Sequence, residues 1–151
     1  MAWIYFAARV DSALRAARRE DRQDWRSYYL DLYETRSDHG NWKAAENAIS
    51  KLADWAQREN VRMMIVHHPE LRHLNPYPFS AITSRVQALS KDMNIPFLDL
   101  LPSLAQEPAE SLWVTRPDPH PNGRAHRLAG EAIYKWVRPL ILPKDEGAAT
   151  Q

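Results

Sequence analysis

The chain contains no cysteine and only four glycines among its 151 residues. Without cysteine there can be no disulfide, no thiol nucleophile and no cysteine-ligated metal site, and the cellular compartment stays open. So few glycines argue against a glycine-rich loop that binds phosphate groups, and we expect no cofactor. The eleven prolines, in contrast, predict stiff loops.

Long apolar runs and an excess of charge are also missing. No run approaches the roughly 18 apolar residues of a transmembrane helix, and no positive region precedes the apolar N-terminus, as it would in a secretory signal. A net charge of +1 gives no reason to expect nucleic-acid binding. We expect a soluble protein of unassigned localisation, with a single domain over residues 1–143 and a disordered tail over residues 144–151.

Two short runs of β-favouring residues predict buried strands at Val61–Val66 and Ile95–Leu100. A helix that Ser80 caps separates them, and this order predicts a parallel pair joined by a right-handed crossover. After the second strand, Gln106–Thr115 is predicted to form a loop that Trp113 anchors.

Helical periodicity is clearest over residues 42–59 and 123–138. Asn41 and Asn122 are suitable N-caps for these two helices, because their side chains can accept hydrogen bonds from the first turn. Pro139 is expected to end the second helix, because proline lacks the main-chain N–H that the helix needs.

Residues 2–19 also have an amphipathic pattern, which fits a helix packed on its own domain, a helix on an anionic membrane surface or a mitochondrial presequence. Residues 20–41 are expected to form a second short helix and a loop. Their aromatic residues suit either the cover of the domain's own core or a surface for a protein or carbohydrate partner. These residues are Trp25, Tyr28, Tyr29 and Tyr33.

The expected fold class is α/β, with a short parallel sheet flanked by helices. Two parallel strands leave two open edges, whereas parallel sheets normally lie buried with both faces covered. The domain is therefore expected to be incomplete, and a second copy of the chain or a partner fragment could cover the missing edge.

The segment Asp118-Pro119-His120-Pro121-Asn122 carries the clearest chemical pattern. Each proline favours an extended conformation of the residue before it, so Asp118 and His120 are expected to lie on the same side of the chain. A carboxylate beside a histidine fixes the tautomer of the imidazole and stabilises the imidazolium. The pattern predicts the acid–base half of a hydrolytic triad.

This segment, with the helix that follows it, resembles the last conserved block of the SGNH (GDSL-type) hydrolases. Arg62–Pro69 and Asn94–Leu100 look like the fourth and fifth strands of that fold, so that the resemblance covers roughly residues 42 to 138. It implies a partial three-layer, flavodoxin-like fold. It also implies a serine ester hydrolase or acyl transferase acting on a small acyl ester, with His120 as general base and Asp118 orienting it.

The chain has no Gly-Asp-Ser sequence, which carries the nucleophile in that family. Asp11-Ser12 is a faint echo of that motif within a helical segment, and Gly40-Asn41 is explained by helix capping rather than as an oxyanion block. The resemblance therefore indicates a C-terminal part of such an enzyme without a recognisable serine nucleophile, and the missing parts are expected in an upstream segment.

Two other readings stay open. A metal site would need three or four convergent ligands, and no known ligand spacing is present. The candidate ligands are His67, His68, His73, Asp118, His120 and His126. Alternatively, the chain is a non-catalytic interaction module or a degenerate remnant that assembles with a partner or with itself.

Overall fold

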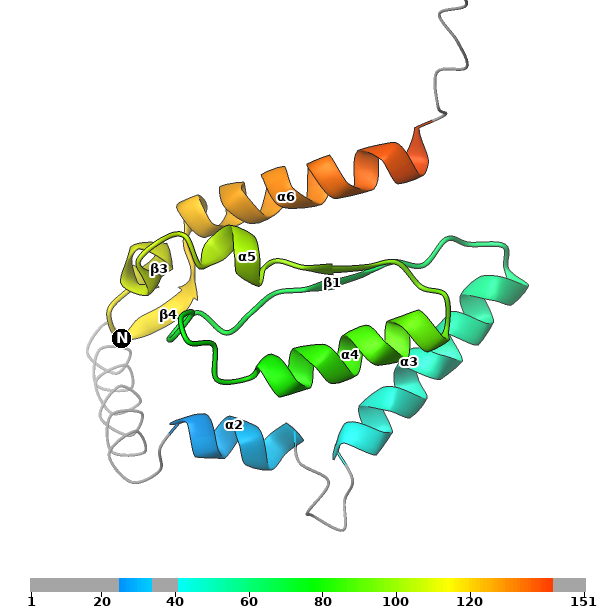
Figure 1. Cartoon of the computed structure of the whole chain (residues 1–151), viewed down its shortest axis with the longest axis horizontal. Helices are drawn as coiled ribbons and strands as arrows, with labels where there is room; N and C mark the ends of the chain where they lie inside the picture. The colour runs from blue at the N-terminus through cyan, green and yellow to red at the C-terminus, as the bar shows by residue number, and fades with distance from the viewer. Residues whose placement is uncertain (1–24, 34–40, 143–151) are drawn as a thin grey trace, which may run out of the picture. The chain divides into compact units, whose positions relative to one another are not determined.

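The computed structural model describes residues 25–33 and 41–142 (Figure 1). The chain divides into two compact units, Met1–Ile49 and Ser50–Gln151, and each is described by itself. The tail predicted over residues 144–151 lies outside the described residues. The single domain expected over residues 1–143 stays a prediction.

The described part of the first unit contains helix α2, Trp25–Tyr33, which matches the short helix expected there. Its aromatic rings contact one another, because the Tyr29 centroid lies 5.6 Å from that of Tyr28 and 6.4 Å from that of Tyr33. Both Tyr28 and Tyr33 are exposed. The helix predicted over residues 2–19 lies outside the described residues.

Helix α3, Asn41–Arg58, extends from the first unit into the second. Its bounds agree with the prediction to within one residue at each end. The side chain of Asn41 lies outside what the structure describes, so its capping role stays a prediction. In the second unit α3 buries Ala56 but leaves Leu52 and Trp55 exposed.

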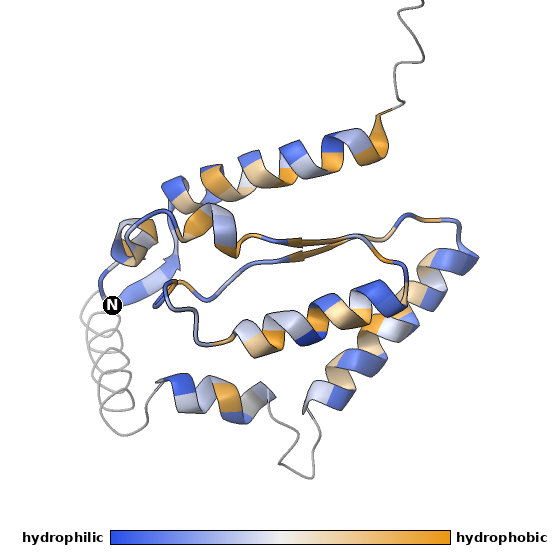
Figure 2. Cartoon of the chain, viewed as in Figure 1, coloured by the Kyte–Doolittle hydropathy of each residue, from blue (hydrophilic) through white to orange (hydrophobic). Residues whose placement is uncertain are grey.

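Strands β1, Ile65–His67, and β2, Phe97–Asp99, form the predicted parallel pair. Each is shorter than expected, because the ladder starts only where Ile65 pairs with Phe97. Within the described residues the pair is a separate two-stranded sheet. Figure 2 shows that apolar residues dominate these strands.

Helix α4, Ser80–Asp92, connects the two strands. The prediction that Ser80 caps this helix is wrong, because the N-cap is Phe79 and no side chain supplies a capping hydrogen bond. Phe79 is buried, and its carbonyl oxygen accepts hydrogen bonds from Ile82 N and Thr83 N at 2.9 and 3.1 Å. Packing therefore fixes the start of α4.

The segment after β2 is more ordered than the predicted loop over residues 106–115. It contains the short helix α5, Leu101–Leu104, the 3-10 helix η1, Ala109–Leu112, and strand β3, Trp113–Thr115. Strand β3 pairs antiparallel with β4, Asp118–Pro121. The expected anchoring by Trp113 is confirmed, since its Nε1–H donates to Leu71 O at 3.0 Å.

Helix α6, Gly123–Ile141, continues past Pro139, so the predicted end of this helix is wrong. A proline in the last turn removes one helical hydrogen bond, and Leu142 N still donates to Arg138 O at 3.0 Å. Figure 1 shows α6 and α4 on opposite sides of the β1–β2 pair. None of the described helices is both long and apolar enough to cross a membrane.

The main core of the second unit lies between α6 and the segments that follow the two strands. Among the apolar residues of α6, Ala129 is buried, whereas Leu128, Ile133 and Val137 are half-buried. The buried cluster consists of Leu71, Leu74, Leu100, Leu104, Leu112, Ala125 and Ala129.

Asn122 caps α6, as the sequence predicts. Its Oδ1 accepts hydrogen bonds from Arg124 N at 2.9 Å and Ala125 N at 3.1 Å. Its Nδ2 donates to Ser111 O and Trp113 O, both at 2.9 Å. One side chain thereby joins the start of α6 to η1 and β3.

We expect Asn122→Ala to lower the free energy of unfolding by about 1–2 kcal/mol, because it leaves the first turn of α6 without its cap. Asn122→Asp keeps the oxygen acceptor but loses the Nδ2 donor bonds. It therefore separates the stability that comes from capping α6 from the stability that comes from the bonds to η1 and β3. Urea denaturation measures both variants, with Gln87→Ala on the exposed face of α4 as control. A loss no larger than that of the control would contradict the assigned role.

Candidate functional site

Asp118 and His120 lie at adjacent same-side positions on β4 and contact each other directly. The Asp118 Oδ1 atom forms a hydrogen bond with His120 Nδ1. It also accepts a hydrogen bond from the His120 main-chain N–H at 3.2 Å. With the carboxylate ionised, Nδ1 carries the proton in this contact, and the other ring nitrogen, Nε2, keeps its lone pair. His120 is thus oriented as a base.

The pair is open to solvent, because 83% of the His120 side chain and 47% of the Asp118 side chain are exposed. The hydrogen bond from the His120 ring, followed by that from the His120 main chain, holds the pKa of Asp118 below its ordinary value. Water screens such a contact and weakens its electrostatic contribution. Efficient proton transfer to a bound substrate would need this surface to be covered.

The hairpin that carries the pair is held at its two ends. Trp113 faces Pro121 and Thr115 faces Asp118, with an irregular register between them. Asn122 N donates to Leu112 O at 2.9 Å directly after the pair. The exposed base therefore lies on a backbone that the buried core anchors.

A second histidine–aspartate pair, which sequence reasoning missed, joins the ends of the parallel strands. His67 Nδ1 lies 3.1 Å from Asp99 Oδ1, and their side chains are only 19% and 27% exposed. Asp99 Oδ1 also accepts a hydrogen bond from Leu101 N at 3.0 Å. The His67 ring stacks near that of Phe97, with centroids 6.4 Å apart.

The sequence contained a signal for this second pair. His67 and Asp99 are the last residues of their strands, and the carboxyl ends of parallel strands share one edge, where α/β proteins bind ligands. The sequence predicts that the first strand ends at Val66, one residue before His67. His67 therefore falls after the predicted strand, where the sequence offers it only as a candidate metal ligand.

The other candidate residues do not converge. His68 Nδ1 lies 3.0 Å from Pro69 O, and His126 is exposed on α6. Within residues 25–33 and 41–142, no three histidine, aspartate or glutamate side chains come together as a metal site would require.

A serine partner for His120 is also missing from the described residues. The nearest serine in sequence, Ser111, donates its hydroxyl to Pro108 O at 2.7 Å. Ser80 is the first residue of α4, and Ser12 lies outside the described residues. The described surface thus presents a base and its carboxylate, without the nucleophile that triad chemistry needs.

We expect an NMR titration to place the pKa of Asp118 below 3.8, and closer to that value in His120→Ala, which keeps only the main-chain bond. Because the folded-state pKa is lowered, the pair stabilises the fold above the unfolded-state value. That stabilisation is lost as the pH falls through the folded-state pKa. His126→Ala serves as control, and an unshifted Asp118 in the wild type would refute the contact.

Asp99→Ala is expected to destabilise the protein by about 1–3 kcal/mol, because it leaves His67 and the N–H of Leu101 without their shared acceptor in a partly buried place. Asp118→Ala, on the exposed hairpin, should cost less. Urea denaturation of both variants at neutral pH tests the order, and a larger loss for Asp118→Ala would show that burial does not distinguish the pairs.

Comparison with known proteins adds no family to this geometry. Neither protein-family models, nor curated proteins, nor solved structures gave a match to this chain. Its functional assignment therefore rests on the residues described above.

Proposed function

We propose that this chain is the C-terminal part of an SGNH-type serine ester hydrolase or acyl transferase. The observation that carries the proposal is the contact between Asp118 and His120 on β4, directly ahead of the Asn122-capped helix α6. A carboxylate at Nδ1 and a free Nε2 are the arrangement that a general base requires. The α/β character of the second unit and its parallel strand pair are compatible with this fold class.

In the proposed reaction, His120 Nε2 takes the proton of a serine hydroxyl while the serine oxygen attacks the acyl carbonyl carbon of a small ester. The carbonyl electrons move to its oxygen and return as the bond to the alcohol breaks, and His120 gives its proton to the departing alcohol. Water or a second alcohol then removes the acyl group by the same proton transfers in reverse order. Asp118 stays ionised and stabilises the imidazolium.

The serine and the oxyanion donors come, in this proposal, from a polypeptide segment outside this sequence. The exposure of His120 supports a nucleophile on another segment, because a base that works in a triad is normally covered by the residues around the nucleophile. The chain by itself then retains base chemistry without the full rate of a triad.

We expect the purified chain to hydrolyse an activated ester, p-nitrophenyl acetate, slowly, because His120 can act as a base without a serine. His120→Ala should reduce this rate by about tenfold or more, since general-base catalysis contributes factors of that size. His126→Ala removes another exposed histidine and should leave the rate nearly unchanged.

Fluorophosphonate labelling with mass spectrometry accompanies the assay, with folding checked by circular dichroism. The proposal predicts no labelled serine in this chain. Labelling of a serine that depends on His120 would show that the nucleophile lies in this chain and not in an external segment. Equal rates for the wild type and His120→Ala would refute the general base.

A further inference from the structure

One edge of strand β1 is open in the part of the chain that the structure describes. Ile65 N donates to Pro96 O at 2.9 Å, and His67 O accepts from Leu100 N at 3.0 Å, so both residues direct main-chain groups toward β2. Alternate residues of a strand point their main-chain groups to opposite sides, so those of Val66 point away from β2. Within the described residues β1 has no second neighbouring strand.

The side chains along this edge do not protect it from association. Natural edge strands often carry lysine, proline or an inward charge that prevents pairing with another chain. From Met63 to His68 the edge carries no lysine, arginine, aspartate, glutamate or proline, and Pro69 marks the end of the stretch that can pair. Val66, in the middle of β1, is 39% exposed, and Val61 is also exposed. Strand β2, in contrast, follows Pro96 and ends in Asp99.

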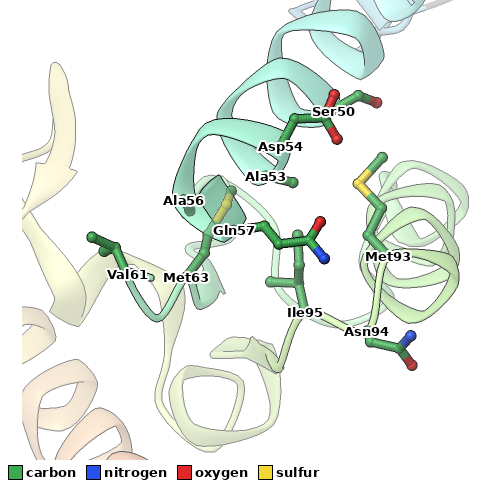
Figure 3. A pocket seen from close by; sticks show the side chains of 10 residues that line it. All are labelled: Ser50, Ala53, Asp54, Ala56, Gln57, Val61, Met63, Met93, Asn94 and Ile95. Carbon is green, nitrogen blue, oxygen red and sulfur yellow. The ribbon is translucent and has the colours of Figure 1, made fainter. Parts of the chain in front are cut away.

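Two cavities flank the segment that leads into β1, and Met63 and Asn94 line both of them. The first, about 430 Å³, lies between α3 and the end of α4, where Figure 3 shows Ala53 and Met93 facing each other. The second, about 350 Å³, is lined by Met64, Pro96 and the α6 residues Leu140 and Ile141. The apolar side chains that lead into β1 are therefore not closely covered on either face of the strand.

We propose that the open edge of β1 binds β1 of a second copy of this chain, antiparallel and about a two-fold axis at Val66. Each Val66 then exchanges two main-chain hydrogen bonds with its counterpart, and the two pairs form one four-stranded sheet. In this register only Val66 faces its own counterpart, and Met64 faces His68 of the partner subunit. The proposal is independent of the hydrolase assignment.

Charge at the two ends of the edge favours a second copy as the occupant. Arg62 lies four residues before Val66 and Glu70 four residues after it. Antiparallel pairing about Val66 therefore brings Arg62 toward Glu70 of the partner subunit. Arg62 uses one Nη to donate to Leu140 O, and both carboxylate oxygens of Glu70 accept hydrogen bonds from Arg72, one from its guanidinium at 2.7 Å and one from its main-chain N at 2.8 Å. Both groups keep further hydrogen-bonding capacity, because a guanidinium has five N–H donors and a carboxylate several acceptor sites.

The absence of native cysteine makes a single-cysteine crosslink a direct test. Opposed residues of a hydrogen-bonded antiparallel pair have Cα atoms about 5.5 Å apart, within the range that a disulfide spans. Under mild oxidation, Val66→Cys should give at least about tenfold more disulfide-linked dimer than Val114→Cys, because pairing raises the effective concentration of the thiols. Val114 is the matched control, an exposed valine in the short strand β3.

Light scattering after size-exclusion chromatography then measures the mass of the unmodified protein over a range of concentrations. A dimer is expected for the wild type and for Val114→Lys, and a folded monomer for Val66→Lys. A wild-type monomer at every concentration would overturn the proposal and leave the edge to a different chain. A dimer that resists Val66→Lys, or equal crosslinking of the two cysteine variants, would place the interface elsewhere and overturn it as well.

Discussion

The geometry of the candidate site depends on the hydrogen bonds that the side chain of Asn122 makes. Its oxygen accepts hydrogen bonds from the first turn of α6, while its nitrogen donates to the carbonyl groups of Ser111 and Trp113. A helix start, a 3-10 turn and a strand all have main-chain groups that would otherwise lack partners. Because one amide satisfies groups in all three, the hairpin with Asp118 and His120 has a defined position beside α6.

Among the residues that the structure describes, two histidine–aspartate pairs have the same chemistry and different surroundings. The pair on β4 is exposed and leaves the His120 ring accessible, which suits a base that awaits a substrate or a covering segment. The pair formed by His67 and Asp99 is half-buried, and Asp99 also caps the turn into α5. The contacts of this pair are explained by a structural role, which is to connect the ends of β1 and β2. Accessibility therefore favours His120 as the functional histidine.

The short parallel sheet is the basis of the proposed association of two copies. Two strands with one helix on each side bury little apolar surface, and an uncovered strand edge leaves main-chain groups open to pairing with another chain. The open edge of β1 and the cavities beside Met63 are what such an incomplete layer leaves exposed. A covering strand from a second copy would complete the layer, and a nucleophile from elsewhere would complete the chemistry of His120. These are separate requirements at separate places in the second unit.

The sequence by itself determined the Asn122 cap and the proximity of Asp118 to His120, which depend on neighbours along the chain. It also determined that the two strands are parallel, because a helix separates them in the chain. It failed where distant contacts decide. Buried Phe79 starts α4 in place of a serine cap, and residues 106–115, which were expected to form a loop, contain η1 and β3. The partnership of His67 with Asp99 arises only when the strands align in register. Local geometry is encoded within a few residues, whereas register and burial depend on segments that only the tertiary structure brings together.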